Sequence, residues 1–394
     1  MRIVLIDYFI EGHHFTFINL FSRALFELGY QVIIMSPSAD TRNYGLAGED
    51  GVTFAQITQI PPLPVKHDFF STRNYVISLW EYTERELNSL ELDSRNDLIF
   101  FPSLDEYLSA YIPTSVIDRI FKYRWAGLYL KPRYLRVKQS FSFLRKGVLN
   151  INYLLNSKRC EAVAVLDPGI IENLKKIAPR KPFFYLPDII AADYPDKSFP
   201  EYKEILGKAA GRKIILLIGA IDHRKGLIKL LQAAKLTDAT RYFFVIAGKI
   251  SEGSFSREEL SLLAELSKDV KNAFFYSRKI VSEAEFNAFI SLCDILFAAY
   301  TNFPYSSNMI GKAVFFNKPI VVSKGYIMHE IVKKYRLGIA VNPEKIEELP
   351  LAFEKLVAST ANVKGNKDYT EDHSWHRFRD NLRMMISAIT LPLK

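Results

Sequence analysis

Residues 2–37 read RIVLIDYFIEGHHFTFINLFSRALFELGYQVIIMSP, and this stretch decides the fold. Residues 3–6 form a continuous apolar run, which predicts a strand buried on both faces of a parallel sheet. Apolar residues then recur at roughly helical spacing over 15–28, and Gly29 ends the predicted helix. A second apolar run at 32–35 predicts another strand. The order strand, helix, strand indicates a βαβ unit and therefore a doubly wound sheet.

Short apolar runs that alternate with helical patterns continue through the rest of the chain. Further buried strands are predicted at 98–101, 127–130, 162–165, 183–186, 213–219, 242–247, 273–276, 295–299, 319–322 and 339–341. Helices are predicted at 76–90, 104–111, 225–236, 256–267, 283–293, 308–316 and 375–389. The two halves of the chain therefore contain the same kind of α/β unit.

The chain of 394 residues is too long for one ordinary core and suits two domains. Residues 188–203 are polar and rich in Pro, Lys and Asp, which is typical of a linker. The predicted organisation is a Rossmann-like N-terminal domain at 1–187, a Rossmann-like C-terminal domain at 204–374 and a C-terminal helix at 375–394.

The composition is that of a folded globular protein, with 49% hydrophobic and 24% charged residues. The first residues lack the features of a signal peptide, and no apolar stretch approaches the ~20 residues that span a bilayer. Cys160 and Cys293 are the only cysteines, which favours two reduced thiols. We therefore expect a cytoplasmic protein.

The net charge of +9 is concentrated in one segment, 122–159. No acidic residue lies between Asp118 and Glu161, and aromatic residues are interleaved with the basic ones. The basic residues are Lys122, Arg124, Lys131, Arg133, Arg136, Lys138, Arg145, Lys146, Lys158 and Arg159. Such a surface attracts anionic lipid headgroups, so one hypothesis is a peripheral contact with the inner face of a membrane. A solvated basic face or a groove for an acceptor phosphate is an equal alternative, whereas no recognised module indicates nucleic acid.

The first candidate site is the loop 219–226, GAIDHRKG, between a predicted strand and a predicted helix. Ligands of open parallel sheets bind beyond the carboxyl ends of the strands. Gly219 begins this loop, and Arg224 and Lys225 would stand there as cations for a diphosphate. A basic helix start without any ligand is the alternative.

The second candidate site is the loop 300–308, which precedes another predicted helix. Ser306, Ser307 and Asn308 are small polar residues that can present hydroxyl and backbone N–H groups to a phosphate. The alternative is strong here, because Ser and Asn are also ordinary helix caps.

The third candidate site is Gly12 with His13 and His14, in the loop after the first strand. Glycine allows close approach of the backbone to a ligand, and a histidine can act as a base near neutral pH. A helix cap or a packed polar residue is the alternative. Seven histidines and two cysteines show no metal-ligand spacing, and no Walker, GxGxxG or GxSxG motif occurs. No metal or cofactor is therefore expected.

Three segments in order resemble the retaining GT-B glycosyltransferases of glycosyltransferase family 4, the glycosyl transferases of group 1. They are EGHHFTFINLFSRALFELGYQV (11–32), LLIGAIDHRKGLIKLLQAAK (216–235) and FNKPIVVSKGYIMHEIVKKYRLGIAVNP (316–343). The resemblance implies two Rossmann-like domains that face each other across a cleft, with the acceptor on the first and the nucleotide-sugar on the second. It also implies that the C-terminal helix near Trp375 crosses back to the first domain.

The same resemblance implies roles for several residues. Lys225 would contact the donor diphosphate, and Gly12 would let the donor phosphates approach. Ser306, Ser307 and Asn308 would lie at the phosphate-facing end of a helix.

The chain also departs from the family pattern. Ala220 stands where the family usually has an arginine, and the two family glutamates fall on Pro304 and Lys312. Arg224 is expected to replace the missing cation, and Lys312 to reach a phosphate.

The sequence thus predicts a hexosyltransferase-like glycosyltransferase of polysaccharide biosynthesis. It would move a sugar from a nucleotide diphosphate-sugar to a hydroxyl of a glycan or a lipid-linked acceptor, without a metal and with retention. His13, His14 and Lys225 are the catalytic candidates. A degenerate glycosyltransferase-like binding module or partner subunit without turnover is the alternative, and a sugar-nucleotide epimerase is a further one.

Overall fold

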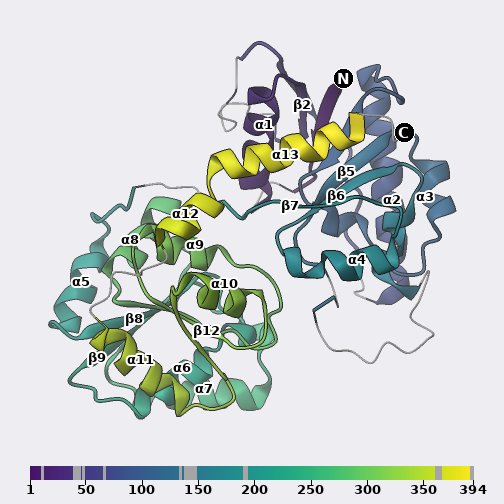
Figure 1. Ribbon diagram of the computed structural model, residues 1–394. Coiled ribbons are helices and arrows are strands. Elements are labelled where there is room, and N and C mark those ends of the chain that lie inside the picture. The colour runs from purple at the N-terminus through teal and green to yellow at the C-terminus, as the bar shows by residue number, and fades with distance from the viewer. Residues whose placement is uncertain are drawn as a thin grey trace. The chain divides into compact units, whose positions relative to one another are not determined.

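The computed structural model describes residues 1–9, 13–38, 46, 49–64, 68–132, 135–136, 149–189, 194–359 and 366–390. The chain forms two compact units. One consists of Met1–Pro187 with Trp375–Lys394, and the other of Asp188–Ser374. Each unit is built around one parallel β-sheet with helices on both faces (Figure 1). The predicted fold class, two doubly wound α/β units, is confirmed.

The first unit contains a seven-stranded sheet in the order β3-β2-β1-β4-β5-β6-β7. Its strands are β1 (Arg2–Ile6), β2 (Gln31–Ser36), β3 (Val52–Gln56), β4 (Leu98–Phe101), β5 (Arg124–Tyr129), β6 (Cys160–Val165) and β7 (Phe183–Tyr185). Every neighbouring pair is parallel. Because a parallel sheet is covered on both faces, its central strand β4 is apolar throughout, and all four of its residues are buried.

Helices of the first unit divide between the two faces of this sheet. They are α1 (His13–Glu27), α2 (Phe69–Leu87), α3 (Thr114–Ile120), α4 (Ile171–Ile177) and α13 (Trp375–Thr390). On one face, Trp80 of α2 packs with Phe101 and Phe121 at centroid distances of 5.3 and 4.9 Å. On the other face, Phe21 of α1 lies 4.6 Å from Phe100. Alternate residues of β4 thus point to opposite layers, as the pleat requires.

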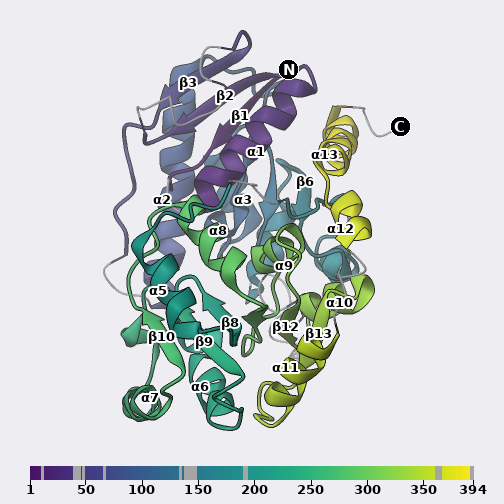
Figure 2. The same ribbon diagram turned by 90° about the vertical axis from the view of Figure 1, so that its left-hand side faces the viewer.

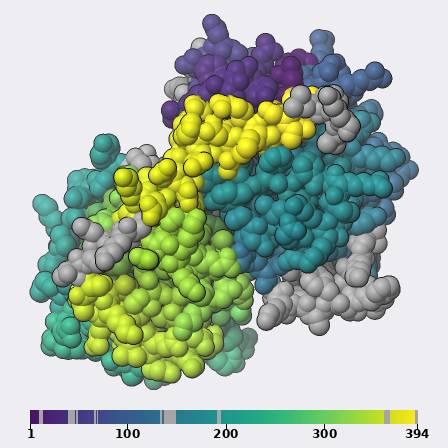
Figure 3. Space-filling view, in the orientation of Figure 1, coloured from purple at the N-terminus to yellow at the C-terminus, as the bar shows by residue number. Residues whose placement is uncertain are grey.

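The C-terminal helix α13 is part of the first unit although it follows the second one in sequence. Its buried residues are Phe378, Leu382, Met385, Ile386 and Ile389. They recur at helical spacing and therefore form one apolar stripe against the unit. Asn381 Nδ2 donates to the carbonyl of Tyr185 at 3.0 Å, and Trp375 Nε1 donates to Glu27 at 2.9 Å. Figure 3 shows α13 in yellow along the surface of this unit.

The second unit contains a six-stranded parallel sheet in the order β10-β9-β8-β11-β12-β13. Its strands are β8 (Lys213–Ile218), β9 (Tyr242–Ala247), β10 (Ala273–Tyr276), β11 (Ile295–Ala298), β12 (Ile320–Ser323) and β13 (Gly338–Val341). Its helices are α5 (Pro200–Ala209), α6 (Leu227–Lys235), α7 (Arg257–Asp269), α8 (Glu283–Leu292), α9 (Asn308–Phe315), α10 (Ile327–Tyr335), α11 (Glu348–Ala358) and α12 (Asn366–Asp372).

Strand β8 separates two apolar layers of the second unit. Ile214, Leu216 and Ile218 belong to the layer under α5, α8, α9 and α10. Ile215 and Leu217 belong to the layer under α6, α7 and α11. Figure 2 shows α8 and α9 above the strands of this unit and α6, α7 and α11 below them. This two-sided burial explains why β8 is an unbroken apolar run rather than an alternating one.

Several elements differ from the sequence prediction for local reasons. The helix expected at 76–90 begins at Phe69, because Asp68 caps it by accepting the amide of Ser71 at 2.9 Å. The helix expected at 104–111 is only a short 3-10 turn, η3 (Leu104–Tyr107), because the backbone of Leu108 is extended, with a φ of −110° and a ψ of 129°. Strand β3 was not predicted; it lies at the sheet edge and is only half apolar. Helix α5 begins at Pro200, within the predicted linker 188–203.

Candidate active site

The carboxyl ends of β8 and β11 form the topological switch point of the second unit. The two strands are neighbours in the sheet although β9 and β10 separate them in sequence. Their loops, 219–226 and 299–307, leave the sheet at the same edge because the strands are parallel. Ligands of doubly wound sheets bind at this position. The structure therefore brings together the first and second candidate loops.

Glycines allow the loop after β8 to run close to its neighbours. Gly219 and Gly226 have φ values of 107° and 76°, in the left-handed region that favours glycine. A Cβ at Gly248, just beyond β9, would lie 2.0 Å from the Gly219 carbonyl oxygen. A Cβ at Gly226 would lie 3.0 Å from the carbonyl oxygen of Ala299. Gly219 thus has a backbone conformation that favours glycine, and its donor-binding role stays a prediction.

Hydrogen bonds tie the two loops to each other. The Thr301 amide donates to the Arg224 carbonyl at 2.8 Å, and Lys229 Nζ donates to Thr301 Oγ1 at 3.2 Å. Asp222 caps the short turn η8 (His223–Lys225) by accepting the Arg224 amide at 3.0 Å. The backbone that carries the side chains of Arg224 and Lys225 is therefore held by hydrogen bonds on both sides.

Lys225 reaches from the first loop to the second. Its Nζ donates to Tyr300 Oη at 2.9 Å and lies 4.2 Å from the centroid of the Tyr300 ring. Tyr300 is the second residue after β11 and is only 3% exposed. The contact places the ammonium group of Lys225 at the switch point.

The cations at this edge of the sheet differ in how their charge is balanced. Arg224 pairs with Asp222 at 2.6 Å, and Lys229 pairs with Glu344. Lys225 makes no ion pair with a carboxylate anywhere in the described residues; its partner is the neutral Tyr300 hydroxyl. A half-buried cation without a carboxylate partner favours an anionic ligand, because the ligand can supply the missing charge.

Lys312 has an internal partner for its charge. Its side chain is 2% exposed, and its ammonium group pairs with Glu283 and donates to Asn287 Oδ1 at 2.9 Å. Both partners belong to α8. A buried charge is strongly destabilising unless it is paired, so this network accounts for the burial of Lys312. The structure therefore gives no support to a free phosphate-facing ammonium here, and the donor-binding role of Lys312 stays a prediction.

The polar residues 306–308 before α9 make one helix-capping hydrogen bond and one hydrogen bond to a residue distant in sequence. Ser307 is the N-cap and accepts the Met309 amide at 3.4 Å, whereas Asn308 is the exposed first residue of the helix. The Ser306 hydroxyl donates to Asp188 Oδ2 at 3.2 Å. Burial raises the pKa of Asp188 to about 6, and the hydrogen bond from Ser306 opposes that rise. Ordinary capping explains Ser307, and the donor-binding roles of these three residues stay predictions.

The third candidate loop lies in the first unit, at the carboxyl end of β1. Gly12 is outside the described residues, and His13 is the first residue of α1. His14 Nδ1 lies 2.8 Å from Oδ2 of Asp7, which is 4% exposed. Burial lowers the pKa of His14, but the hydrogen bond and the charge of Asp7 outweigh this, so the pKa is raised above its usual value. Asp7 and His14 therefore have the geometry of a base and an orienting carboxylate, and the catalytic role of His14 stays a prediction.

Asp7 and Tyr300 were not among the predicted site residues, although Tyr300 begins the candidate loop 300–308. Asp7 is the first polar residue after the apolar run of β1, and Tyr300 closely follows β11. In a doubly wound sheet these positions lie at the ligand-binding edge. A position just after a predicted strand was therefore a usable signal for a candidate site residue, although neither residue belongs to a sequence motif.

The basic segment 122–159 is partly neutralised by carboxylates of its own unit. Lys122 lies 3.7 Å from Glu84, Arg124 lies 2.9 Å from Glu161, and Arg136 pairs with Asp167. Residues 133–134 and 137–148 lie outside the described residues. These three basic residues thus have partners within their own unit, and a membrane contact of the segment remains a proposal.

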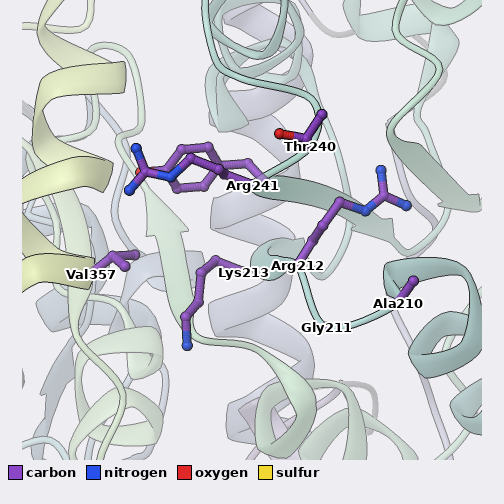
Figure 4. A pocket seen from close by; sticks show the side chains of 8 residues that line it. Ala210, Gly211, Arg212, Lys213, Thr240, Arg241 and Val357 are labelled. Atoms are coloured by element: carbon purple, nitrogen blue, oxygen red, sulfur yellow. The ribbon is translucent and has the colours of Figure 1, made fainter.

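A surface hollow of about 360 Å³ lies at the opposite edge of the second sheet. It is lined by Ala210, Gly211, Arg212, Lys213, Thr240, Arg241, Tyr242 and Val357, at the amino ends of β8 and β9. Figure 4 shows the Arg212 and Arg241 side chains pointing away from each other. Arg212 donates to backbone carbonyls, and Lys213 pairs with Asp294 at 3.0 Å. These cations do not converge on one point, so the hollow is not the candidate site.

Within the described ranges, no group of three or more His, Cys, Asp or Glu side chains is arranged to hold a metal ion. No helix in that part of the chain is long and apolar enough to cross a membrane.

Sequence comparison places the second unit in a known family. Residues 198–372 match the family described as "Glycosyl transferases group 1". This range covers nearly the whole of the second unit, Asp188–Ser374, and includes both loops of the switch point. A search of curated proteins gives no match.

Solved structures match the chain over almost its full length. Sucrose-phosphate synthase from Thermosynechococcus elongatus is 14% identical, with a TM-score of 0.70 over 98% of both chains. An E. coli structure described as trehalose-6-phosphate bound with UDP-2-fluoro glucose is 10% identical, with a TM-score of 0.70 over 99% of both chains. HepE from Anabaena, in complex with UDP and glucose, is 13% identical, with a TM-score of 0.66 over 98% of this chain and 100% of that one. At these identities the likeness shows a shared fold. The chain therefore has the GT-B fold of these glycosyltransferases, and residues 198–372 of its second unit match the glycosyl transferases group 1 family.

Proposed function

We propose that this protein transfers a sugar from a nucleoside diphosphate sugar to an acceptor hydroxyl. The observation that carries the proposal is the Lys225 ammonium group, which lies at the switch point of the second unit and has no carboxylate partner in the described part of the chain. A leaving diphosphate would supply the missing negative charge there. Two of the similar structures hold UDP or a UDP-sugar analogue, which makes UDP the first nucleotide to test.

The proposed reaction is a substitution at the anomeric carbon. The bond from this carbon to the diphosphate oxygen breaks, and a bond to the acceptor oxygen forms. Negative charge develops on the leaving diphosphate, where Lys225, Arg224 and the N-terminus of α9 would stabilise it. Cations and backbone dipoles suffice for this role, so the proposal includes no metal and no cofactor. His14, oriented by Asp7, would position the acceptor hydroxyl or accept its proton.

Retention of configuration is proposed from the resemblance to family 4. The product anomer, measured by NMR with an anomerically pure donor, tests this part alone. An inverted product would contradict retention and leave the transferase proposal intact.

The acceptor is proposed to be a glycan or a lipid-linked sugar, used at the inner face of the membrane in polysaccharide biosynthesis. The basic segment 122–159 supports this, since its exposed residues include Lys131 and Lys158. Flotation with anionic liposomes at low salt is the test. Protein that stays in solution would contradict the membrane contact.

Nucleotide binding is the direct test of the donor site. Thermal unfolding is compared with and without UDP, GDP, ADP and CDP at millimolar concentration. A nucleotide at about 100 times its Kd stabilises the folded protein by roughly 2.7 kcal/mol. A shift with one nucleotide supports the proposal and identifies the donor class; no shift with any of them contradicts it.

Two lysine variants locate that site. Lys225→Ala should abolish most of the nucleotide-dependent shift and of the transfer rate while leaving the unfolding temperature of the free protein nearly unchanged. Lys229→Ala is the matched control, because Lys229 is four residues away and Glu344 already balances its charge. Equal effects of the two variants would contradict the assignment of Lys225.

A binding module without turnover is the second candidate. Pro304 and Lys312 occupy the positions of the family glutamates, and Lys312 is engaged by Glu283 and Asn287. Nucleotide binding with neither transfer nor donor hydrolysis would favour this candidate. An epimerised donor without transfer would instead indicate an epimerase.

A further inference from the structure

Tyr300 is held more firmly than a loop residue usually is. Its amide donates to the Ala298 carbonyl at 2.9 Å, and its own carbonyl accepts the Ser323 hydroxyl from β12. The residue is 3% exposed, and its ring packs edge-on against Phe303 at a centroid distance of 5.2 Å. The phenol group is therefore a fixed point beside the carboxyl end of β11.

Lys225, by contrast, has a long side chain with many rotamers, and ordering it costs conformational entropy. Its ammonium group nevertheless has a defined place. It donates to the Tyr300 hydroxyl at 2.9 Å, lies over the ring at 4.2 Å, and would be 3.9 Å from a Cβ at Gly219. The hydroxyl and the ring face of Tyr300 thus hold the ammonium next to the bare backbone of Gly219.

The chemistry of the partner matters as much as the geometry. Carboxylates pair with the neighbouring cations, Asp222 with Arg224 and Glu344 with Lys229. A phenol accepts a hydrogen bond and presents the negative face of its ring without cancelling the positive charge. Tyr300 can therefore order Lys225 and still leave the charge available to an anion.

We propose that Tyr300 is a positioning residue for Lys225, which pre-orders the ammonium group for the diphosphate of the donor. The inference rests on the proposed function, because it requires Lys225 to contact that diphosphate. Pre-ordering removes an entropy cost from binding and so raises affinity without a new contact to the ligand.

A double-mutant cycle tests this inference, with inorganic pyrophosphate as the probe. Its Kd is measured by calorimetry for the wild-type protein, Tyr300→Phe, Lys225→Ala and the double variant. Tyr300→Phe keeps the ring and removes the hydroxyl, and is expected to weaken binding about tenfold. In the Lys225→Ala background the same change is expected to have no further effect, because a positioning residue acts only through its partner.

Thr301→Val is the matched control in the same loop. It removes the hydroxyl that contacts Lys229, and pyrophosphate affinity should not change. Urea unfolding of each free variant shows whether a loss of affinity is merely a loss of folding.

The outcomes separate this inference from the proposed function. Weaker binding by Lys225→Ala but unchanged binding by Tyr300→Phe would overturn the role of Tyr300 alone. Additive losses in the double variant would also overturn it, since Tyr300 would then act independently of Lys225. Unchanged binding by Lys225→Ala, or no binding by the wild-type protein, would overturn the proposed diphosphate site and this inference with it.

Discussion

His14 Nδ1 lies 2.8 Å from Asp7 Oδ2, directly beyond the carboxyl end of β1. The other carboxylate oxygen of Asp7 accepts the Phe9 amide at 2.9 Å, so the carboxylate is fixed from two sides. In the neutral imidazole this arrangement places the proton on Nδ1 and leaves Nε2 as a proton acceptor. The pair therefore has the geometry of a base and its orienting group, in the unit where an acceptor is expected.

Asp7→Asn should lower the transfer rate about 100-fold, since an amide can donate to Nδ1 and stabilise the wrong tautomer of His14. Steady-state kinetics with a fixed donor measures the effect. Asp68→Asn is the control, because Asn caps the start of α2 as well as Asp does. A normal rate in Asp7→Asn would remove His14 as the base.

The stability contributed by His14 should depend on pH in one direction. Its pKa is raised in the folded protein, so its contribution is complete below the unfolded value of about 6.5 and is lost as pH rises through the folded value. The destabilisation caused by His14→Gln should therefore be larger at pH about 5 than at pH about 9.

Urea unfolding of the wild-type protein and the variant at both pH values measures this difference. His376→Gln is the control, because His376 is 70% exposed and its pair with Asp380 contributes little. A destabilisation by His14→Gln that grows with rising pH would contradict the predicted linkage.

Gly248→Ala should destabilise the second unit by at least about 2 kcal/mol. The new Cβ would lie 2.0 Å from the Gly219 carbonyl oxygen, and the φ of 132° is unfavourable for alanine. Gly253→Ala is the matched control, since its Cβ would meet nothing within 4 Å. Denaturant unfolding compares the stabilities of the two variants. Equal stability would contradict the prediction, because it would mean that the ends of β8 and β9 move apart without a cost in free energy.

Phe378→Ala should destabilise the first unit by about 3–5 kcal/mol, because it leaves a cavity between α13 and α1. Phe378 is fully buried and lies 5.3 Å from Phe21. Met384→Ala, on the same helix but 56% exposed, should cost little. Denaturant unfolding measures the stability of the unit, and hydrogen exchange of the α13 amides shows whether the helix detaches. Detachment of α13 in Phe378→Ala without a loss of stability of the first unit would contradict the prediction.

Much of the fold could be predicted because each central strand is buried on both faces. The runs at 214–218 and 98–101 must then be apolar throughout, and such runs are visible in a single sequence. Strand β3 escaped prediction because an edge strand is only partly buried and needs no such run. The helix expected at 104–111 ends early, at the extended backbone of Leu108, which no sequence pattern indicated.

Sequence alone determined that the loops 219–226 and 300–308 lie at the ligand-binding edge, because parallel strands point their carboxyl ends the same way. Only the tertiary structure decided which cation there remains unpaired. Lys312 resembles a ligand-binding lysine in sequence until α8 brings Glu283 against it, whereas Lys225 meets Tyr300, 75 residues away, and no carboxylate in the described residues. An ion pair forms only within a few ångströms, and packing between distant segments sets distances on that scale.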